Sequence, residues 1–545
     1  MKTLKKLFAL VATVATCLSL GATSVLAEGD STTTTTGSIT INNASGDYAA
    51  YQVFSGTYNS STGTLGNITW GSGVTSFNFE IEKTENGTTT KETTNDAAKI
   101  AEYLATQSDN SEVVKKFADA AIAAKKNDSS KYYTASTNQN KAEFTSLPFG
   151  YYVVENTSVA PSKDSSGTQT DTTGAYTKFI LKVVGKATAT NKASVPSMTK
   201  KVKDTNDSVA DSTTEWQDSA DYDIGDAVPF QLTGTVASNY ADYKTYYFAF
   251  HDVEETGLTF KEITSVYVVN GEGDSQTKNV IDSSAYTLVK ATDENSPITD
   301  GCTFEIKFNN LKDIEAVQGG SKIVVEYTST LNTSANIGNK GNVNKAKLEF
   351  SNNPNEEQSG TDKPGTGETP WDNVIVFTYQ TVVNKVDQDN NALKGAKFTL
   401  SKVKVGTDGK ATEEVVKTFE YSEKDNTDTT VFTFKGLDDG TYVLKETETP
   451  AGYNTCDPIE FTVTADHTIE WDGTNRTSVL TSLTVNNTQF SVDDSKNIST
   501  SVVNKKGSVL PSTGGIGTTI FYVTGAILML GAGVLLLSRR NSTSK

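Results

Sequence analysis

Short runs in which apolar and polar residues alternate recur along most of the chain between residues 38 and 507. Examples are YAAYQVF (48–54), KFILKVV (178–184), TYYFAFHDV (245–253) and KIVVEYTS (322–329). Because successive side chains of a strand point to opposite faces, such runs are typical of strands that bury one face. Their number and the turn residues between them predict a mainly β chain built from sandwich domains.

The runs fall into three segments of the 545-residue chain. We expect three tandem Ig-like β-sandwich domains over residues 38–192, 196–354 and 371–507. Residues 355–370 contain turn formers and almost no apolar side chain, so they are predicted to be a linker. Residues 28–37 are dominated by threonine and are expected to be a disordered start.

The first domain is expected to contain a helical insertion. Residues 96–107 and 111–125 carry apolar side chains at helical spacing, and Asn95 and Ser111 are the expected N-caps. This domain is therefore predicted to be a strand framework with two inserted helices.

Charge and composition exclude several classes of protein. With 66 acidic against 48 basic residues, the net charge is −18, so no broad basic surface is available for nucleic acid. Two histidines argue against a histidine-based metal enzyme. Of the three cysteines, Cys17 precedes the domains and Cys302 and Cys456 lie far apart, so we expect no disulfide framework, metal cluster or cofactor.

The first 27 residues predict a secretory signal peptide. Lys2, Lys5 and Lys6 precede an apolar run that ends in small residues, with cleavage expected after Ala27. The alternative is an N-terminal membrane anchor, which the shortness of the apolar run disfavours.

A second signal lies at the C-terminus, where the motif Leu510-Pro511-Ser512-Thr513-Gly514 precedes an apolar stretch, residues 516–537. That stretch is long enough to cross a bilayer, and Arg539-Arg540 would hold the tail, residues 538–545, in the cytoplasm. The arrangement resembles the cell-wall sorting signal of Gram-positive surface proteins. The resemblance implies that a sortase cleaves between Thr513 and Gly514 and that Thr513 becomes the acyl donor.

In the third domain, strand alternation points three unlike polar groups inward: Lys385, Glu446 and Asn504. Burying them without partners would cost several kcal/mol. Either a salt bridge with hydrogen bonds satisfies them, or the lysine amine attacks the asparagine carbonyl with the carboxyl as proton shuttle. Alternation alone leaves both explanations open.

The residues around Glu446 favour the second explanation. Gly440-Thr441-Tyr442-Val443-Leu444-Lys445-Glu446, followed by Thr447, Pro450, Gly452 and Tyr453, resembles the E-box of Gram-positive pilins and collagen-adhesin B-type repeats. The resemblance implies an autocatalytic isopeptide bond between Lys385 and Asn504 with Glu446 as the catalyst.

The second domain has a related set of residues without an E-box. It resembles the Asp-assisted domain of major pilins, which implies a Lys201–Asn344 bond with Asp252 as the catalyst. Lys200 beside Lys201, and Asn352 on the same face as Asn344, are alternatives. His251 precedes Asp252 and faces the other way, so we expect it at the surface.

The first domain departs from this pattern. Its sequence Gly150-Tyr151-Tyr152-Val153-Val154-Glu155-Asn156 looks like an E-box, but the carboxylate is one residue out of register and Asn156 occupies its place. Its first strand, SITINNA, has no lysine. We therefore expect no internal isopeptide bond in this domain.

The same family resemblance implies an acceptor lysine near the junction of the first two domains. Lys192, in an extended stretch before Pro196, is the first candidate and Lys186 the second, although neither follows a proline as in the family motif. Either lysine is otherwise explained as a solvated linker residue. Joining Thr513 to such a lysine is a head-to-tail contact that does not close, so it would give a filament.

The expected function is that of a structural shaft subunit of a sortase-assembled Gram-positive pilus, without substrate turnover beyond its own cross-links. The expected partners are other copies of the chain, pilus-class and housekeeping sortases, minor pilins, peptidoglycan and, if any, host or microbial surface ligands. A monomeric wall-anchored adhesin, which would need no acceptor lysine, is the alternative. The sequence contains no catalytic motif of a hydrolase. Asp387-Gln388-Asp389 is better explained as a turn than as a calcium loop.

Overall fold

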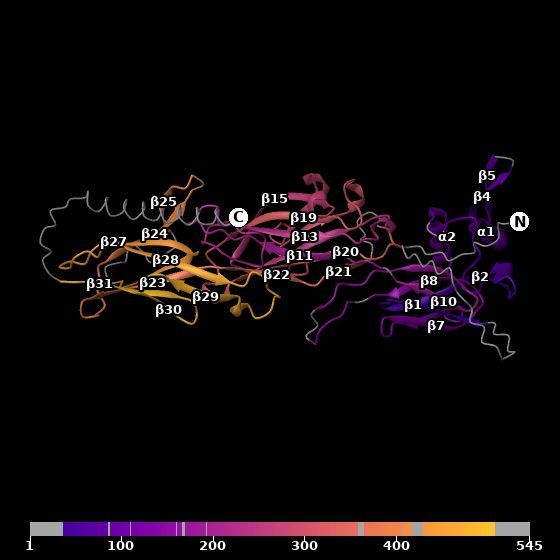
Figure 1. The fold of residues 1–545 in the computed structure, drawn as a ribbon, viewed down its shortest axis with the longest axis horizontal. Coiled ribbons are helices and arrows are strands. Elements are labelled where there is room, and N and C mark those ends of the chain that lie inside the picture. The colour runs from indigo at the N-terminus through magenta and orange to yellow at the C-terminus, as the bar shows by residue number, and fades with distance from the viewer. Residues whose placement is uncertain are drawn as a thin grey trace.

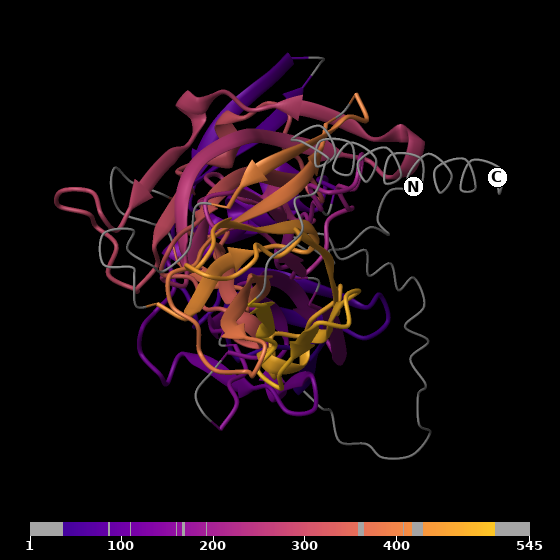
Figure 2. The ribbon, with the colours of Figure 1, turned by 90° about the vertical axis from the view of Figure 1, so that its left-hand side faces the viewer.

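The computed structural model describes residues 36–506, except for 86–87, 109–110, 160, 166–168, 192, 358–364, 407 and 417–428. Three β-rich units follow one another along the long axis of the molecule (Figure 1), and the end-on view places them one behind another (Figure 2). The predicted mainly β, multidomain fold is confirmed.

The predicted signal peptide, the sorting motif 510–514, the apolar segment 516–537, the tail 538–545 and Lys192 all lie outside the described residues. Within the described part, no helix has both the length and the apolar character needed to cross a membrane.

The first unit contains two sheets, a hairpin and two helices. One sheet has the order β10-β1-β7 and the other the order β3-β2-β8-β9, with β6 also paired to β2. The strands are β1 (Thr36–Asn42), β2 (Asp47–Asn59), β3 (Thr64–Trp70), β6 (Tyr132–Ser136), β7 (Lys141–Pro148), β8 (Gly150–Ser158), β9 (Lys178–Val183) and β10 (Lys186–Thr190), and the hairpin is β4 (Phe79–Glu85) with β5 (Thr88–Thr94).

The helical insertion is confirmed as α1 (Ala97–Leu104) and α2 (Glu112–Ala123), which bury their apolar faces in one core with β2 and β8. The N-cap of α1 is Asp96 rather than the predicted Asn95, because the Asp96 carboxylate accepts hydrogen bonds from the backbone amides of residues 98 and 99. Ser111 occupies the N-cap position of α2, as predicted.

The second unit is a sandwich of two larger sheets with the orders β11-β13-β19-β15-β16 and β12-β22-β20-β14-β18-β17, with β21 beside β20. Its strands are β11 (Ser197–Val202), β12 (Ser219–Asp221), β13 (Ala227–Thr235), β14 (Phe248–Glu254), β15 (Leu258–Asn270), β16 (Thr277–Val280), β17 (Thr287–Lys290), β18 (Phe304–Phe308), β19 (Lys322–Leu331), β20 (Asn342–Ser351), β21 (Thr366–Glu368) and β22 (Asp372–Phe377). A continuous apolar core lies between the two sheets.

The boundary between the second and third units differs from the prediction. Strand β22, which the prediction placed in the third domain, hydrogen-bonds to β20 and β12 and so completes the second sandwich. The apolar run continues through Thr378 into the next strand. The alternation of apolar and polar residues therefore gives no sign that the chain changes sheet there. Part of the predicted linker, β21, also pairs with β20.

The third unit is a smaller sandwich with sheets in the orders β26-β23-β31-β30 and β25-β24-β27-β28-β29. Its strands are β23 (Tyr379–Asp387), β24 (Lys397–Val405), β25 (Ala411–Val415), β26 (Val431–Leu437), β27 (Gly440–Glu448), β28 (Ile459–His467), β29 (Leu480–Val485), β30 (Phe490–Val492) and β31 (Ile498–Asn504). The first and last of these strands, β23 and β31, pair in parallel.

Short 3-10 helices complete the described secondary structure. They are η1 (Tyr240–Asp242), η2 (Gly273–Ser275), η3 (Ser283–Ala285), η4 (Leu311–Asp313), η5 (Gly338–Lys340) and η6 (Arg476–Ser478). The last of them carries a contact between the second and third units, because the Arg476 guanidinium donates to both carboxylate oxygens of Glu255, at 2.7 and 2.9 Å.

Candidate functional site

In the third unit, the structure brings together the three polar residues that alternation predicted to face inward. Lys385 on β23, Asn504 on β31 and Glu446 on β27 are all buried, and they come from both sheets of the sandwich. Lys385 lies opposite Val502 in the parallel register, two residues from Asn504. The lysine and the asparagine therefore lie on neighbouring strands, and the glutamate faces them from the other sheet.

The hydrogen bonds of this site satisfy the Asn504 amide nitrogen but not its carbonyl oxygen. The Asn504 Nδ2 atom donates to both carboxylate oxygens of Glu446, at 2.8 and 3.1 Å. The Asn504 Oδ1 atom is buried and has no hydrogen-bond partner in the described part of the chain. The Lys385 ammonium donates only to backbone, to the carbonyl oxygens of Val386 (3.1 Å) and Val502 (3.0 Å), among the bonds described.

Burial has a direct chemical effect on Lys385. Desolvation lowers the pKa of its amine, and the nearby Glu446 carboxylate opposes that shift without cancelling it. A lowered pKa increases the fraction of neutral amine, which is the nucleophilic form.

The second unit contains a similar group of residues, with Lys200 as its lysine. The Lys200 Nζ atom lies 2.5 Å from Asp252 Oδ2 and 2.6 Å from the hydroxyl oxygen of Tyr327. Asn344 Nδ2 donates to the same hydroxyl at 3.0 Å. Lys200 and Tyr327 come from one sheet, and Asp252 and Asn344 come from the facing sheet.

The structure does not place Lys201, the first candidate, in this group, and the lysine found there is the alternative, Lys200. The Lys200 side chain is fully buried, whereas Lys201 is 31% exposed and forms an ion pair with Asp218 at 2.6 Å. Val202 packs in the core, so by strand alternation Lys200 shares its inward face and Lys201 points outward. The alternative Asn352 is also not in this group, because its amide donates to the Gly174 carbonyl of the first unit.

The environment of Lys200 and Asp252 favours their neutral forms. Desolvation is the largest effect on both groups: it lowers the pKa of Lys200 and raises the pKa of Asp252, and their mutual attraction only partly opposes it. As in the third unit, the asparagine carbonyl oxygen, here Asn344 Oδ1, is buried without a hydrogen-bond partner among the described atoms.

Two residues of this group were missed from the sequence. Tyr327 contacts Lys200, Asp252 and Asn344, and Glu254 lies opposite Asn344 in the register of β14 and β20. Burial and the neighbouring Asp252 charge raise the pKa of Glu254 to about 7. Glu254 has the same strand parity as Asp252, which is the signal that could have identified it.

In the first unit, the residues at the E-box-like positions have other partners. Glu155 accepts a hydrogen bond from Lys125 Nζ at 2.6 Å. The Asn156 side chain bonds to Ser45 and to the backbone and hydroxyl of Thr177. The candidate acceptor Lys186 is exposed at the start of β10, where it pairs with Ser38 in the parallel register.

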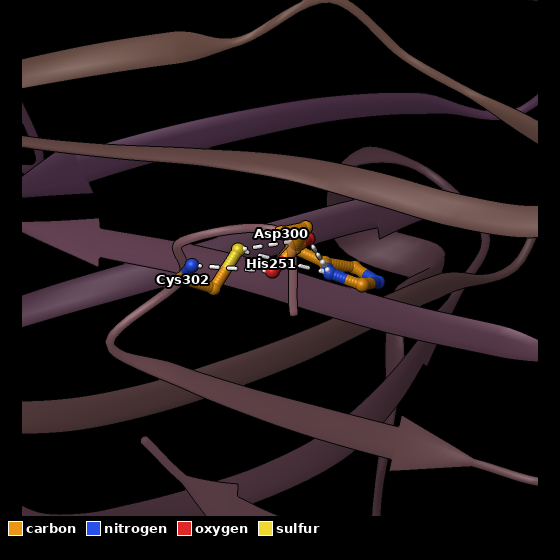
Figure 3. A group of neighbouring side chains, drawn as sticks. All are labelled: His251, Asp300 and Cys302. Carbon is orange, nitrogen blue, oxygen red and sulfur yellow. Dashed lines mark hydrogen bonds and ion pairs between the residues drawn. The ribbon is translucent and has the colours of Figure 1, made fainter. Parts of the chain in front are cut away.

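The prediction that His251 lies at the surface is wrong. It does face away from Asp252, but only 6% of the residue is exposed, because the loop carrying Asp300 and Cys302 packs beside the ring (Figure 3). Burial would lower its pKa. Hydrogen bonds to Cys302, Glu305 and Glu349, together with the Glu305 charge, outweigh that effect and raise the pKa to about 11.

Two segments of the chain match known protein families. Residues 380–477 match the SpaA prealbumin-like fold domain, and residues 502–543 match the LPXTG cell wall anchor motif. The chain is also 26% identical over 417 residues to the trypsin-resistant surface T6 protein of Streptococcus pyogenes serotype M6, covering 65% of this chain and 71% of the relative. Together these matches support a Gram-positive major pilin with a cell wall anchor.

Solved structures similar to this pilin include the T6 backbone pilin of S. pyogenes serotype M6 and the full-length major pilin SpaD of Corynebacterium diphtheriae. The first has 18% identity and a TM-score of 0.49, and covers 87% of this chain and 99% of the other. The second has 18% identity and a TM-score of 0.45, with coverage of 87% and 98%.

Proposed function

We propose that this pilin is the shaft subunit of a covalent filament and that its second and third domains are each locked by an internal lysine–asparagine amide bond. The observation that carries the proposal is the burial of a lysine, an asparagine and an acidic residue together in two successive sandwiches. Hydrogen bonds alone leave the asparagine carbonyl oxygens unsatisfied, whereas in the reaction the carbon of the same carbonyl group is the site of attack.

The same reaction applies to both domains. The neutral lysine amine attacks Cγ of the asparagine, a carbon–nitrogen bond forms, and negative charge develops on the carbonyl oxygen of the tetrahedral intermediate. The lysine proton passes to the departing nitrogen, and one ammonia molecule leaves. The carboxyl group ends in the protonation state in which it began, so each domain completes a single turnover.

The route of the proton differs between the two domains. In the third domain, Glu446 already contacts the nitrogen that leaves, Asn504 Nδ2. In the second, Asp252 reaches the leaving nitrogen of Asn344 through the hydroxyl of Tyr327, which donates to Asp252 Oδ2 at 2.8 Å. We therefore propose a direct proton transfer in the third domain and a relay through Tyr327 in the second.

The bonds would strengthen the domains by restricting their unfolded chains. The Lys385–Asn504 and Lys200–Asn344 bonds close loops of about 120 and about 145 residues, and by analogy with disulfides each would contribute about 5 kcal/mol. Unlike disulfides, amide bonds resist reduction, which suits a filament outside the cell.

Polymerisation would join Thr513 of one subunit to a lysine of the next, with Lys192 or Lys186 as the acceptor. Lys186 is supported by its exposed position at the edge of the first domain. The test is an immunoblot of wall-digested cells boiled in SDS, comparing wild type with Lys186→Ala and Lys192→Ala, and with Lys131→Ala as an exposed-lysine control. A ladder that collapses in one junction variant supports the proposal. A single monomer band in wild type would favour the anchored adhesin.

A further inference from the structure

A second cluster of reactive side chains lies on the opposite side of β14 from Asp252. His251 comes from β14, Asp300 and Cys302 from the loop before β18, and Glu305 from β18 itself. His251, Cys302 and Glu305 are buried and Asp300 is partly exposed at the edge (Figure 3). The proposed cross-linking reaction uses none of these residues.

Three potential ligand atoms, from His251, Asp300 and Cys302, lie within 4.8 Å of one another, and Glu305 approaches the same histidine nitrogen as a fourth. His251 Nδ1 lies 2.9 Å from Asp300 Oδ2, 3.3 Å from Glu305 Oε1 and 3.8 Å from Cys302 Sγ. Cys302 Sγ lies 3.1 Å from Asp300 Oδ2. Zinc bonds of about 2.0–2.3 Å in a tetrahedron require ligand atoms about 3.3–3.8 Å apart, so small side-chain adjustments would fit one ion between them.

A carboxylate also orients the His251 ring through its other nitrogen. Its Nε2 atom lies 3.3 Å from Glu349 Oε2, and the second oxygen of Glu349 accepts a hydrogen bond from Thr366 at 2.9 Å. A carboxylate on the distal nitrogen fixes the tautomer of a metal-binding histidine and strengthens its basicity. This contact leaves Nδ1 as the nitrogen that faces the cysteine and the other two carboxylates.

We propose that His251, Asp300, Cys302 and Glu305 form a site for one borderline divalent cation, with Zn²⁺ as the preferred ion. The single sulfur and nitrogen donors favour Zn²⁺ over Ca²⁺ or Mg²⁺, which prefer all-oxygen sites. This inference departs from our expectation from the sequence, where two histidines and scattered cysteines gave no metal-binding spacing.

Binding of Zn²⁺ requires a neutral imidazole and a thiolate, so the protons that these two groups hold leave as the ion enters. The neighbouring Lys307 pairs with Oε2 of Glu305, whereas Oε1 faces the histidine. The cation would tie the loop of Asp300 and Cys302 to β14 and β18 and would protect the thiol from oxidation.

Cobalt offers a spectroscopic test on the purified chain of residues 28–513. Co²⁺ replaces Zn²⁺ in such sites, and a thiolate ligand gives a charge-transfer band in the near ultraviolet. We expect this band in the wild type, its loss in Cys302→Ser, and its retention in Cys456→Ser, which removes the other described free cysteine. A wild type without the band, or a band that survives Cys302→Ser, would overturn the proposal.

Zinc stoichiometry provides a second readout, which does not depend on whether the cysteine variant folds. After equilibrium dialysis, elemental analysis should give one Zn²⁺ per chain for the wild type. Asp300→Asn, which changes a partly exposed loop residue, should bind Zn²⁺ at least tenfold more weakly. Circular dichroism would show that this variant folds. Equal zinc content in wild type and Asp300→Asn, in addition to an unchanged cobalt spectrum, would contradict the assignment.

Discussion

The Nζ atom of Lys200 lies 2.6 Å from the hydroxyl oxygen of Tyr327 in the closed interior of the second sandwich. The same hydroxyl contacts Asp252 and Asn344, so one oxygen atom links the lysine, the carboxylate and the asparagine. In the third domain, Glu446 contacts Asn504 directly. The two groups therefore connect their carboxylate to their asparagine in different ways.

Replacing Tyr327 with phenylalanine should slow cross-linking of the second domain by about ten- to a hundredfold and leave the third domain unaffected, because only the relay hydroxyl is lost. The measurement is the time course of ammonia loss by mass spectrometry of tryptic peptides from freshly made protein. Tyr243→Phe, which changes another buried tyrosine of the same core directly after η1, is the matched control. Equal rates in Tyr327→Phe and wild type would exclude the relay.

Lys200→Ala should abolish the bond of the second domain, whereas Lys201→Ala should leave it intact. The first variant loses the buried nucleophile, and the second loses an exposed ion pair with Asp218. We expect Lys200→Ala to lower the stability of the domain by about 5 kcal/mol through loss of the closed loop. Thermal unfolding and peptide mass would report both effects. A domain that stays cross-linked without Lys200 would identify Lys201 as the nucleophile instead.

Glu446→Gln should leave Lys385 and Asn504 unlinked, because an amide cannot shuttle the lysine proton to the leaving nitrogen. The intact mass of this variant should show one ammonia molecule fewer lost than the wild type. Glu448→Gln changes an exposed carboxylate two residues further along β27 and serves as the control. Full cross-linking in Glu446→Gln would remove this residue from the mechanism.

The contact between the second and third domains should weaken at alkaline pH. Burial alone would lower the pKa of His467, but hydrogen bonds to Asp204 and Asp221 and their charges raise it to about 10. Because the folded-state pKa lies above the unfolded value of about 6.5, the stabilisation is complete below pH 6.5 and is lost as the pH rises through 10. A shift of this size corresponds to about 3–5 kcal/mol.

Thermal unfolding between pH 6 and pH 10 measures this effect. The wild type should lose stability steadily over this range, and His467→Gln should show a flatter profile. Parallel profiles for the two proteins would show that the imidazole does not titrate between the two carboxylates.

Strand alternation correctly predicted that Lys385, Glu446 and Asn504 face inward, since all three occupy buried positions of regular strands. The same rule, applied to Val202, would have selected Lys200, and similarity of local sequence led instead to Lys201. Tyr327 could not be assigned a role, because an aromatic residue at an inward position is usually part of the core. Its role depends on the facing sheet, whose distance from Tyr327 is set by packing.

The two other discrepancies have related causes. The change of sheet at Thr378 is invisible in the sequence, because β22 and β23 present one continuous apolar run while pairing with different partners. His251 was expected at the surface because its strand parity is opposite to that of Asp252. Parity distinguishes the two faces of a sheet, but it does not show whether a loop covers the outer face.

The most direct test of the central claim is the intact mass of residues 28–513 produced in the absence of any sortase. The account predicts a mass lower than that of the sequence by two ammonia molecules, with cross-linked peptides containing Lys385 with Asn504 and Lys200 with Asn344. A mass equal to that of the sequence would contradict it and would leave both groups of buried residues as hydrogen-bonded polar clusters.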